Sequence, residues 1–275
     1  MLYLGVDVGS LSCDAALVDD AERLVAWSVV PTGARNAQAI ARARKEVLEA
    51  AGAAPEDLAA TIATGYGRDR VDDRVASVTE ITCHARGIRA LVPGADVLID
   101  IGGQDSKAVR LDRNGLVAEF AMNDKCAAGT GRFLEAMARA LEVDVDQLGH
   151  LEHGSRGNVS LSSMCTVFAE SEVVSLIADG AEVCEIVRGF HRAIASRTLL
   201  LVKRVARNVT GLRIAMSGGV ARNAGVVRAL SEVLGSALTV PPEPDIVGAL
   251  GAALIARERA AGASEELRRS RAPAT

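Results

Sequence analysis

Two distant stretches of this chain follow one pattern, and this internal repeat constrains the fold more than any other feature of the sequence. The stretches are "GVDVGSLSCDAALVDD" (residues 5–20) and "LIDIGGQDSKAVRLDR" (residues 98–113). Each consists of an apolar run, an Asp, an apolar residue and a Gly, then small and polar residues and a second apolar strand. Repetition of a whole supersecondary unit predicts two lobes of related topology, facing each other across a cleft.

The order of predicted elements is the same after each start. The first thirty residues read as three strands, "LYLGVDVG", "CDAALVD" and "RLVAWSVVP", followed by a helix at about residues 37–51 and the strand "LAATIATG". From residue 96 the strands "ADVLIDIGG", "SKAVRLD" and "GLVAEFAMN" precede a helix at about residues 130–141. This alternation predicts an α/β fold.

The repeat also suggests where the lobes begin and end. We expect a first lobe over residues 1–94, a second over residues 95–244, and a C-terminal helix over residues 245–262 that returns to the first lobe. The charged remainder, residues 263–275, is expected to be a flexible tail.

Composition excludes several classes of partner. The formal net charge of -4, with 31 basic and 35 acidic residues, provides no broad positive face for nucleic acid or anionic lipid. No apolar run reaches the roughly 18 residues that a membrane span needs, so a cytoplasmic protein is expected. Five cysteines, an odd number in a chain of 275 residues, predict reduced thiols and no disulfide framework.

Glycine-rich turns follow three predicted strands. Asp7 and Asp100 each end an apolar strand and are followed by glycines, whose backbone N–H groups can close around phosphate oxygens while the carboxylates hold Mg²⁺ through water. The third turn, "SGGVARNAG", ends a strand and starts a helix, where the helix N-terminus suits a nucleotide. A Rossmann site fits poorly because the first turn returns as a strand, and the Walker A lysine pattern is absent.

With these turns, "DVGS", "DIGGQDSK" and "SGGVARN", the chain resembles the acetate kinase, heat-shock chaperone and actin superfamily of ATPases. The resemblance implies two ribonuclease H-like lobes in an actin-like ATPase fold around a nucleotide cleft that binds ATP and Mg²⁺. One departure is Asp14, where many members carry a basic residue. The resemblance implies catalytic roles for Asp7, Asp100 and Gln104, and nucleotide-binding roles for Gly9, Ser10, Gly102, Gly103, Gln104, Ser217, Gly218, Gly219 and Asn223.

Two cysteines occupy parallel settings. Cys126 in "NDKCAAGTGRFLE" and Cys165 in "SSMCTVFAESEV" each precede a run with apolar residues at helical spacing. These residues are Phe133, Leu134, Met137 and Leu141 after Cys126, and Val167, Phe168, Val174 and Ile177 after Cys165. Each thiol is therefore predicted at or near a helix N-terminus, where the helix dipole favours a thiolate or a bound anionic cluster.

Two cysteines alone do not complete a site of four thiolates, so several interpretations stay open. Zinc with His150 and His153 is one, although a solvated histidine pair in a polar, exposed loop is the simpler explanation of "GHLEHG". A disulfide is disfavoured in a reducing compartment, and two core cysteines would need no ligand. A symmetric dimer with two cysteines from each chain would complete one [4Fe-4S] cluster.

Together with "ATGYGR", "EITCHARG" and "GALGAALIA", these segments resemble the ATP-dependent activators (component A) of 2-hydroxyacyl-CoA dehydratases, a group that includes benzoyl-CoA reductase ATPase subunits. The resemblance implies a homodimer that shares one [4Fe-4S] cluster through Cys126 and Cys165 of each chain. It implies electron transfer, driven by ATP hydrolysis, from reduced ferredoxin or flavodoxin to a dehydratase (component D).

Other functions stay open at this point. A benzoyl-CoA reductase-type system is an alternative partner. A sugar or metabolite kinase of the same superfamily would have dispensable cysteines, as would a non-redox ATP-binding module that remodels a protein partner.

Overall fold

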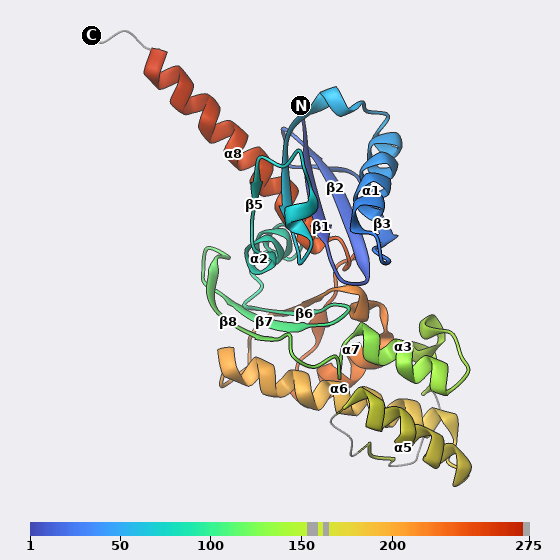
Figure 1. Cartoon of the computed structure of the whole chain (residues 1–275). Helices are drawn as coiled ribbons and strands as arrows, with labels where there is room; N and C mark the ends of the chain where they lie inside the picture. Colours follow the sequence, from blue (N-terminus) through green and yellow to red (C-terminus); the bar gives the residue numbers. More distant parts are fainter. Residues whose placement is uncertain (153–158, 162–164, 272–275) are drawn as a thin grey trace. The chain divides into compact units, whose positions relative to one another are not determined.

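The chain folds into two compact α/β units, each of which contains one five-stranded mixed sheet (Figure 1). The structure is a computed structural model that describes residues 1–152, 159–161 and 165–271. The first unit comprises Met1–Leu91 with Asp245–Thr275, and the second comprises Val92–Pro244. The sequence-based expectation places this boundary after residue 94.

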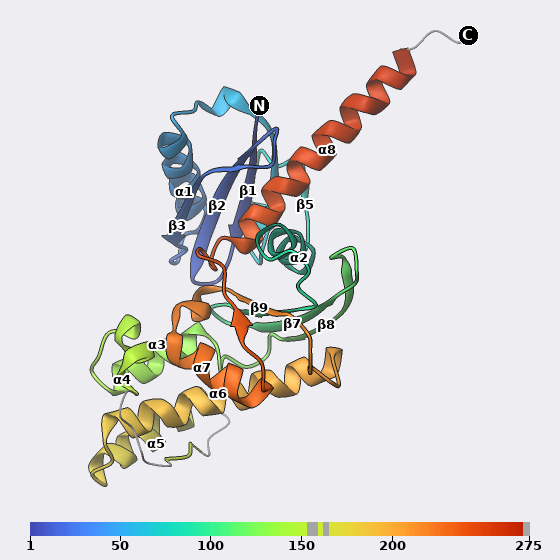
Figure 2. The ribbon, with the colours of Figure 1, turned by 180° about the vertical axis from the view of Figure 1, so that it is seen from behind.

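The first unit has the strand order β3-β2-β1-β4-β5, with β1 antiparallel to β2 and parallel to β4. Helix α1 packs on one face of this sheet, while α2 and α8 cover the other (Figures 1 and 2). The elements are β1 Leu2–Val8, β2 Ser12–Asp19, β3 Leu24–Pro31, α1 Asn36–Ala51, β4 Leu58–Thr64, β5 Ala76–Ser77, α2 Glu80–Leu91 and α8 Val247–Arg271.

The second unit has the order β10-β9-β6-β7-β8. Read from the other end of the sheet, with β6 counted as the first strand, this is the same order as in the first unit. β6 is antiparallel to β7 and parallel to β9. The elements are β6 Val97–Ile101, β7 Ser106–Leu111, β8 Val117–Asn123, α3 Gly131–Ala140, α4 Leu148–Leu151, α5 Thr166–Ala178, α6 Val183–Val205, β9 Ile214–Ser217, α7 Ala224–Leu234 and β10 Leu238–Thr239.

The shared strand order confirms the fold class expected from the repeat, an α/β protein with two ribonuclease H-like lobes. Each unit opens with two antiparallel hairpin connections and adds its fourth strand in parallel through a helical crossover. A parallel neighbour requires such a crossover because the chain must return to the same end of the sheet. The two lobes therefore repeat one supersecondary plan.

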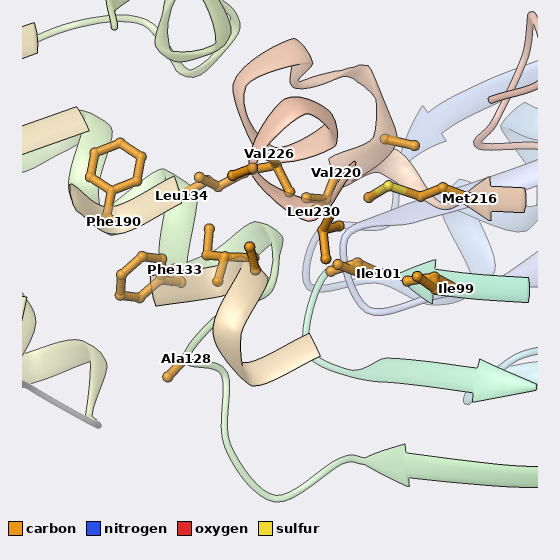
Figure 3. Close-up of a cluster of buried hydrophobic side chains, with 14 of the residues drawn as sticks. Ile99, Ile101, Ala128, Phe133, Leu134, Phe190, Met216, Val220, Val226 and Leu230 are labelled. Atoms are coloured by element: carbon orange, nitrogen blue, oxygen red, sulfur yellow. The ribbon is translucent and has the colours of Figure 1, made fainter. Parts of the chain in front are cut away.

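The core of the second unit lies between one face of its sheet and helices α3, α6 and α7 (Figure 3). Ile99 and Ile101 of β6 contribute alternate residues to this face, as expected of a strand with period two. Phe133 of α3 meets Phe190 of α6 in an edge-to-face contact, with ring centroids 6.2 Å apart. The core thus holds α3, the helix that follows Cys126, against the sheet.

Two details differ from the sequence-based expectations. Helix α8 runs to Arg271, beyond the end expected at residue 262, because its last turns are rich in Ala, Glu and Arg, which favour helix. The "GHLEHG" segment, expected as a loop, begins in the short helix α4. In the part of the chain that the structure describes, no helix combines the length and apolar character needed to cross a membrane.

Candidate functional site

A row of polar side chains crosses the sheet of the second unit where β6 ends. Asp100 of β6 is the register partner of Ser217 on β9 and of Lys107 on β7. The Ser217 hydroxyl donates to Asp100 Oδ1 at 2.7 Å, and the Lys107 ammonium lies 3.4 Å from Asp100 Oδ2 and 2.7 Å from Asp105 Oδ2. All four side chains are buried, so the ammonium offsets carboxylate charge that water does not reach.

The turn after β6 is fastened to helix α3. Gly102 N–H donates to the Asp105 carbonyl at 3.0 Å and closes the turn. The Gly103 carbonyl accepts from Arg132 N–H and from the Thr130 hydroxyl, both at 2.9 Å, and the Gly102 carbonyl accepts from Gly131 N–H at 2.9 Å. Any shift of this turn is therefore passed to the start of α3. The predicted water-orienting residue, Gln104, is exposed at the tip of the same turn.

The first unit repeats this row with one change of charge. Asp7 of β1 is the register partner of Thr64 on β4 and of Asp14 on β2. Gly9 N–H donates to the Ser12 carbonyl at 2.9 Å, the same turn closure as in the second unit. Gly9 and Ser10 are partly exposed in this turn, as a loop that receives phosphate requires. The position that corresponds to Lys107 is Asp14.

Glycines hold the Asp7 carboxylate closely. A Cβ atom at Gly65 would lie 2.4 Å from Asp7 Oδ1, and one at Gly248, in the first turn of α8, would lie 2.0 Å from Oδ2. Gly65 also has a φ of +83°, which side chains rarely adopt. Both positions therefore require glycine, and the carboxylate is confined between β4 and α8.

Asp14 is a buried acid among other acids. Its side chain accepts a hydrogen bond from the Ser12 hydroxyl at 3.1 Å through Oδ2, whereas Oδ1 has no hydrogen-bond partner among the described residues. Burial raises the pKa of Asp14 well above its usual range, and the nearby Asp7 and Asp245 carboxylates raise it further. Where many members of the superfamily carry a basic residue, this chain has a carboxyl group that is difficult to ionise.

The third glycine turn joins β9 to α7. Gly218 has a φ of +84°, and a Cβ atom there would lie 2.3 Å from the Ile101 carbonyl, so only glycine fits beside β6. Gly219 is exposed. Asn223 caps α7 by accepting from Val226 N–H at 3.0 Å, and its Nδ2 is buried with no hydrogen-bond partner in the described part of the chain. An amide donor left in this way fits a ligand carbonyl or ring nitrogen.

Cys126 and Cys165 are both exposed and both belong to the second unit. Cys165 is the N-cap residue of α5, as predicted. Cys126 precedes Thr130, the N-cap of α3, by one further turn of chain, in which Gly129 has a φ of +94°. The helix dipole falls off within the first turn, so it acts on Cys165 and much less on Cys126.

The helices beyond the two cysteines bury different amounts of apolar surface. On α3 the predicted apolar residues Phe133, Leu134 and Met137 are in the core. On α5 the corresponding residues stay exposed, Val167 at 67% and Phe168 at 69% of their surface. Exposed apolar faces of this kind are typical of interaction surfaces.

The other cysteines are packing residues. Burial raises the pKa of the Cys13 and Cys83 thiols to about 12, which keeps them protonated and poor metal ligands. Cys184 is half-buried near the start of α6. Among the described residues no three His, Cys, Asp or Glu side chains are grouped to hold a metal ion. The zinc hypothesis rests on His150, which is exposed on α4, and on His153, which lies outside the described residues.

One partly buried network was not expected from the sequence. Glu152 accepts from Arg228 Nη2 on α7 at 2.6 Å and lies 2.7 Å from Nδ1 of His191 on α6. Burial acts to raise the pKa of Glu152, but hydrogen bonds with His191 and Arg228 outweigh it and lower the pKa to about 2. The network ties α6 and α7 to the chain that leads toward Cys165.

Each unit therefore groups part of the predicted site. Asp100, Gly102, Gly103, Ser217 and Gly218 lie together in the second unit, whereas Asp7, Gly9 and Ser10 lie together in the first.

Two ribonuclease H-like lobes, each with a glycine-rich hairpin turn beside a buried aspartate, define an ATPase of the actin-like class. The chain belongs to the BadF/BadG/BcrA/BcrD ATPase family, whose model matches residues 4–256. It is 48% identical over 262 residues to the activator of lactoyl-CoA dehydratase from Anaerotignum propionicum, covering 94% of this chain and 99% of the relative.

Two solved structures share this fold over nearly the whole chain. Component A of the (R)-2-hydroxyglutaryl-CoA dehydratase from Acidaminococcus fermentans has a TM-score of 0.90 and 44% identity, covering 95% of this chain and 99% of its own. The activator of the 2-hydroxyisocaproyl-CoA dehydratase from Clostridium difficile, with bound ADPNP, has a TM-score of 0.90 and 42% identity, covering 97% of this chain and 98% of its own.

Proposed function

We propose that this protein is an ATP-dependent reductive activator that transfers one low-potential electron to a 2-hydroxyacyl-CoA dehydratase. The three relatives described above are activators of such dehydratases or component A of one. The observation that carries the proposal is the pair of exposed cysteines, Cys126 and Cys165, in the unit whose glycine turn is bonded to α3. A metabolite kinase would give no reason for this pair.

The cysteines fit a [4Fe-4S] cluster that two chains share. Such a cluster takes four thiolates, and one chain offers two exposed thiols. A two-fold axis beside α5 would bring the cysteines of two chains together and would cover the exposed Val167 and Phe168. When bound, the cluster supplies a one-electron carrier that reduced ferredoxin or flavodoxin can load.

ATP with Mg²⁺ is assigned to the hairpin turns and the β9–α7 turn. Backbone N–H groups beyond Gly9 and Gly102 suit phosphate oxygens, and the Asp7 and Asp100 carboxylates suit Mg²⁺ through water. The Asn223 Nδ2 donor suits the adenosine. Gln104, exposed at the turn, is assigned to orient the attacking water.

The coupling of the two activities follows from the hydrogen bonds of Thr130. Its hydroxyl oxygen lies 2.9 Å from the Gly103 carbonyl oxygen and 2.6 Å from the Ala127 carbonyl oxygen, and its single proton is shared between them, so one side chain joins the phosphate turn to the residue after Cys126. ATP is needed because moving one electron through 0.1 V against its potential costs about 2.3 kcal/mol.

Thr130→Val should lower the number of electrons transferred per ATP hydrolysed, while Thr130→Ser should keep it. An unchanged ratio in Thr130→Val would remove Thr130 from the mechanism.

The deciding experiment is an iron count on protein purified anaerobically. We expect about four irons per two chains in the wild type, and loss of that iron in both Cys126→Ser and Cys165→Ser. Cys184→Ser, a half-buried cysteine of the same unit, is the matched control and should keep its iron. Iron absent after anaerobic reconstitution of the wild type would refute the redox function.

The dimer has its own test. Val167→Asp places a charge on the exposed face of α5 and should convert the dimer to monomers, as measured by light scattering on a sizing column. Val75→Asp is the matched control, because Val75 is 61% exposed and lies in the first unit. A Val167→Asp protein that stayed dimeric would exclude this face as the interface.

The enzyme that receives the electron can also be identified by experiment. The dehydratases named for the relatives favour a 2-hydroxyacyl-CoA dehydratase, with a benzoyl-CoA reductase-type enzyme as the alternative. Reduction of one purified enzyme and not the other, in the presence of ATP and reduced ferredoxin or flavodoxin, distinguishes them.

A further inference from the structure

Helix α6 of the second unit carries an excess of positive charge that the nucleotide and cysteine sites do not use. Its residues, Val183–Val205, include one acidic side chain, Glu185 in the first turn, and five basic ones. The basic residues are Arg188, Arg192, Arg197, Lys203 and Arg204. The whole chain has a formal net charge of -4, so this helix opposes the overall balance. Local charge of this kind attracts partners of the opposite sign.

Two of these arginines line a cavity of about 160 Å³ between α6 and the strands β7 and β8 (Figure 1). Arg197, Leu200 and Arg204 project from one side of the helix, because residues three and seven apart lie on the same face. Leu200, between the two arginines, is 66% exposed. The opposite wall includes Ser106 and Asn123, which are register partners on β7 and β8. None of the described residues that line the cavity is acidic.

The cavity borders the segment that carries Cys126. Asn123 Nδ2 donates to the Cys126 carbonyl at 3.3 Å. Gly129 also lines the cavity, and a Cβ atom there would lie 3.9 Å from Arg197 Cδ, so the aliphatic stem of Arg197 packs against the loop before α3. Cys126 itself is exposed. The two guanidinium groups therefore belong to a pocket beside a cysteine that we assign to the cluster.

The size and chemistry of the cavity limit what can occupy it. Pockets for cofactors and metabolites usually measure about 300–1,000 Å³, so a cavity of about 160 Å³ suits a single side chain better than a free ligand of that size. Guanidinium groups bind carboxylates through paired hydrogen bonds, and Leu200 offers apolar contact for an aliphatic stem. The occupant that fits is an Asp or Glu side chain on the surface of another protein.

We propose that this pocket is the docking point of the electron donor, an acidic protein that places a carboxylate between Arg197 and Arg204. The inference rests on the proposed function, which supplies the donor and the cluster. Docking here brings the donor beside Cys126, and one electron passes from the donor to the cluster with no bond formed or broken. Electron-transfer partners that separate after each turnover have small interfaces, and opposite charges speed their encounter. A small pocket with two arginines meets both needs.

The test is the rate at which flavodoxin hydroquinone reduces the cluster of anaerobically purified protein, followed by stopped-flow absorbance at several ionic strengths. Arg204→Glu is the variant to use because Arg204 is exposed, whereas Arg197 packs against the cysteine loop. Its second-order rate constant should fall at least about tenfold at low ionic strength, and added salt should narrow the difference from the wild type. Arg204→Lys keeps the charge and should stay within about threefold of the wild type.

Lys203→Glu is the matched control. It makes the same change of net charge at the preceding residue, which is exposed on another side of α6 and does not line the cavity. Its rate constant with flavodoxin should fall by less than about twofold. Reduction by dithionite, which needs no docking surface, should be alike in the two variants, and both should keep the iron of the wild type.

Several results would overturn the inference. One is a wild-type rate with flavodoxin that does not depend on ionic strength, which decides the matter without any variant. Another is a rate for Arg204→Glu that equals that of the wild type or of Lys203→Glu. Equal slowing with dithionite would mean that Arg204 acts on the cluster itself, and slow transfer to the dehydratase after normal reduction would assign the pocket to the acceptor. Each of these leaves the proposed function standing if the wild type holds iron, whereas a wild type without iron removes both.

Discussion

The hairpins that open the two units have the same backbone and different electrostatics. Both turns are closed by a glycine N–H that donates to the carbonyl three residues further on. In both, the aspartate has a hydroxyl residue as its register partner on one neighbouring strand and a charged or ionisable residue on the other. In the β6–β7 hairpin the row contains its own ammonium, Lys107. In the β1–β2 hairpin the equivalent residue is Asp14, an acid beside an acid.

The two hairpins share their strand order, register and turn closure but differ in the charge of their side chains. Strand order, register and turn closure are set by backbone hydrogen bonds, which do not depend on the charge of the side chains. The charge of the row is a property of one residue, so one lobe offsets part of its carboxylate charge with its own ammonium, whereas the other has two carboxyl groups and no lysine in its row.

The largest effect is expected from removing the ammonium. Lys107→Met leaves Asp100 and Asp105 buried without their cation, and should destabilise the second unit by about 3–5 kcal/mol in denaturant unfolding. Lys203→Met, an exposed lysine on α6 of the same unit, is the control and should change stability by no more than about 0.5 kcal/mol. Equal values for the two variants would mean that the buried ion pairs do not hold this row together.

A second prediction compares the two hydroxyls of the rows. Ser217→Ala removes the donor that satisfies Asp100 Oδ1 and should cost about 2 kcal/mol, because the acceptor is charged and buried. Thr64→Val keeps the shape of a buried side chain whose hydroxyl interacts with the neutral Cys83 thiol and with no charged group that satisfies it, and should cost less, about 0.5 kcal/mol. Unfolding curves of both variants decide whether the rows differ as proposed, and a Thr64→Val loss as large as that of Ser217→Ala would erase the difference.

Much of this fold could be predicted from the sequence, since it rests on local periodicity. The strand patterns around Asp7 and Asp100 and the apolar spacing of Phe133, Leu134 and Met137 indicated the repeat and α3, and the structure confirms both. Such signals depend on neighbours within a few residues, which a sequence displays directly.

The missed features depend on contacts between distant residues or on backbone conformation. Glu152 meets His191 and Arg228, which lie 39 and 76 residues away, and no spacing rule relates them. The offset of Cys126 from α3 follows from a left-handed turn at Gly129. The apolar spacing of α5 resembled that of a core helix, yet it does not indicate whether the same chain or another covers that face.

The smallest effect concerns proton binding by Asp14 when no divalent cation is present. Burial raises its pKa most, and the carboxylates of Asp7 on β1 and Asp245 before α8 raise it further, whereas Ser12 on β2 and His84 on α2 lower it. The pKa of the folded state then exceeds that of the unfolded state, so the stabilising contribution is complete below about pH 4, the usual pKa of Asp, and is lost as pH rises toward the raised folded pKa.

In chelating buffer the first unit should therefore become less stable as the pH rises above about 4, and Asp14→Asn should lose this dependence. The variant should be more stable than the wild type by about 1 kcal/mol at the upper end of that range, because an amide does not ionise in the buried row. The measurement is the free energy of unfolding between about pH 4 and 8, compared with Glu56→Gln, whose exposed carboxylate serves as control. Parallel curves for the wild type and Asp14→Asn would mean that Asp14 ionises in the folded protein as easily as in the unfolded chain. The two hairpins would then differ in sequence but not in electrostatics.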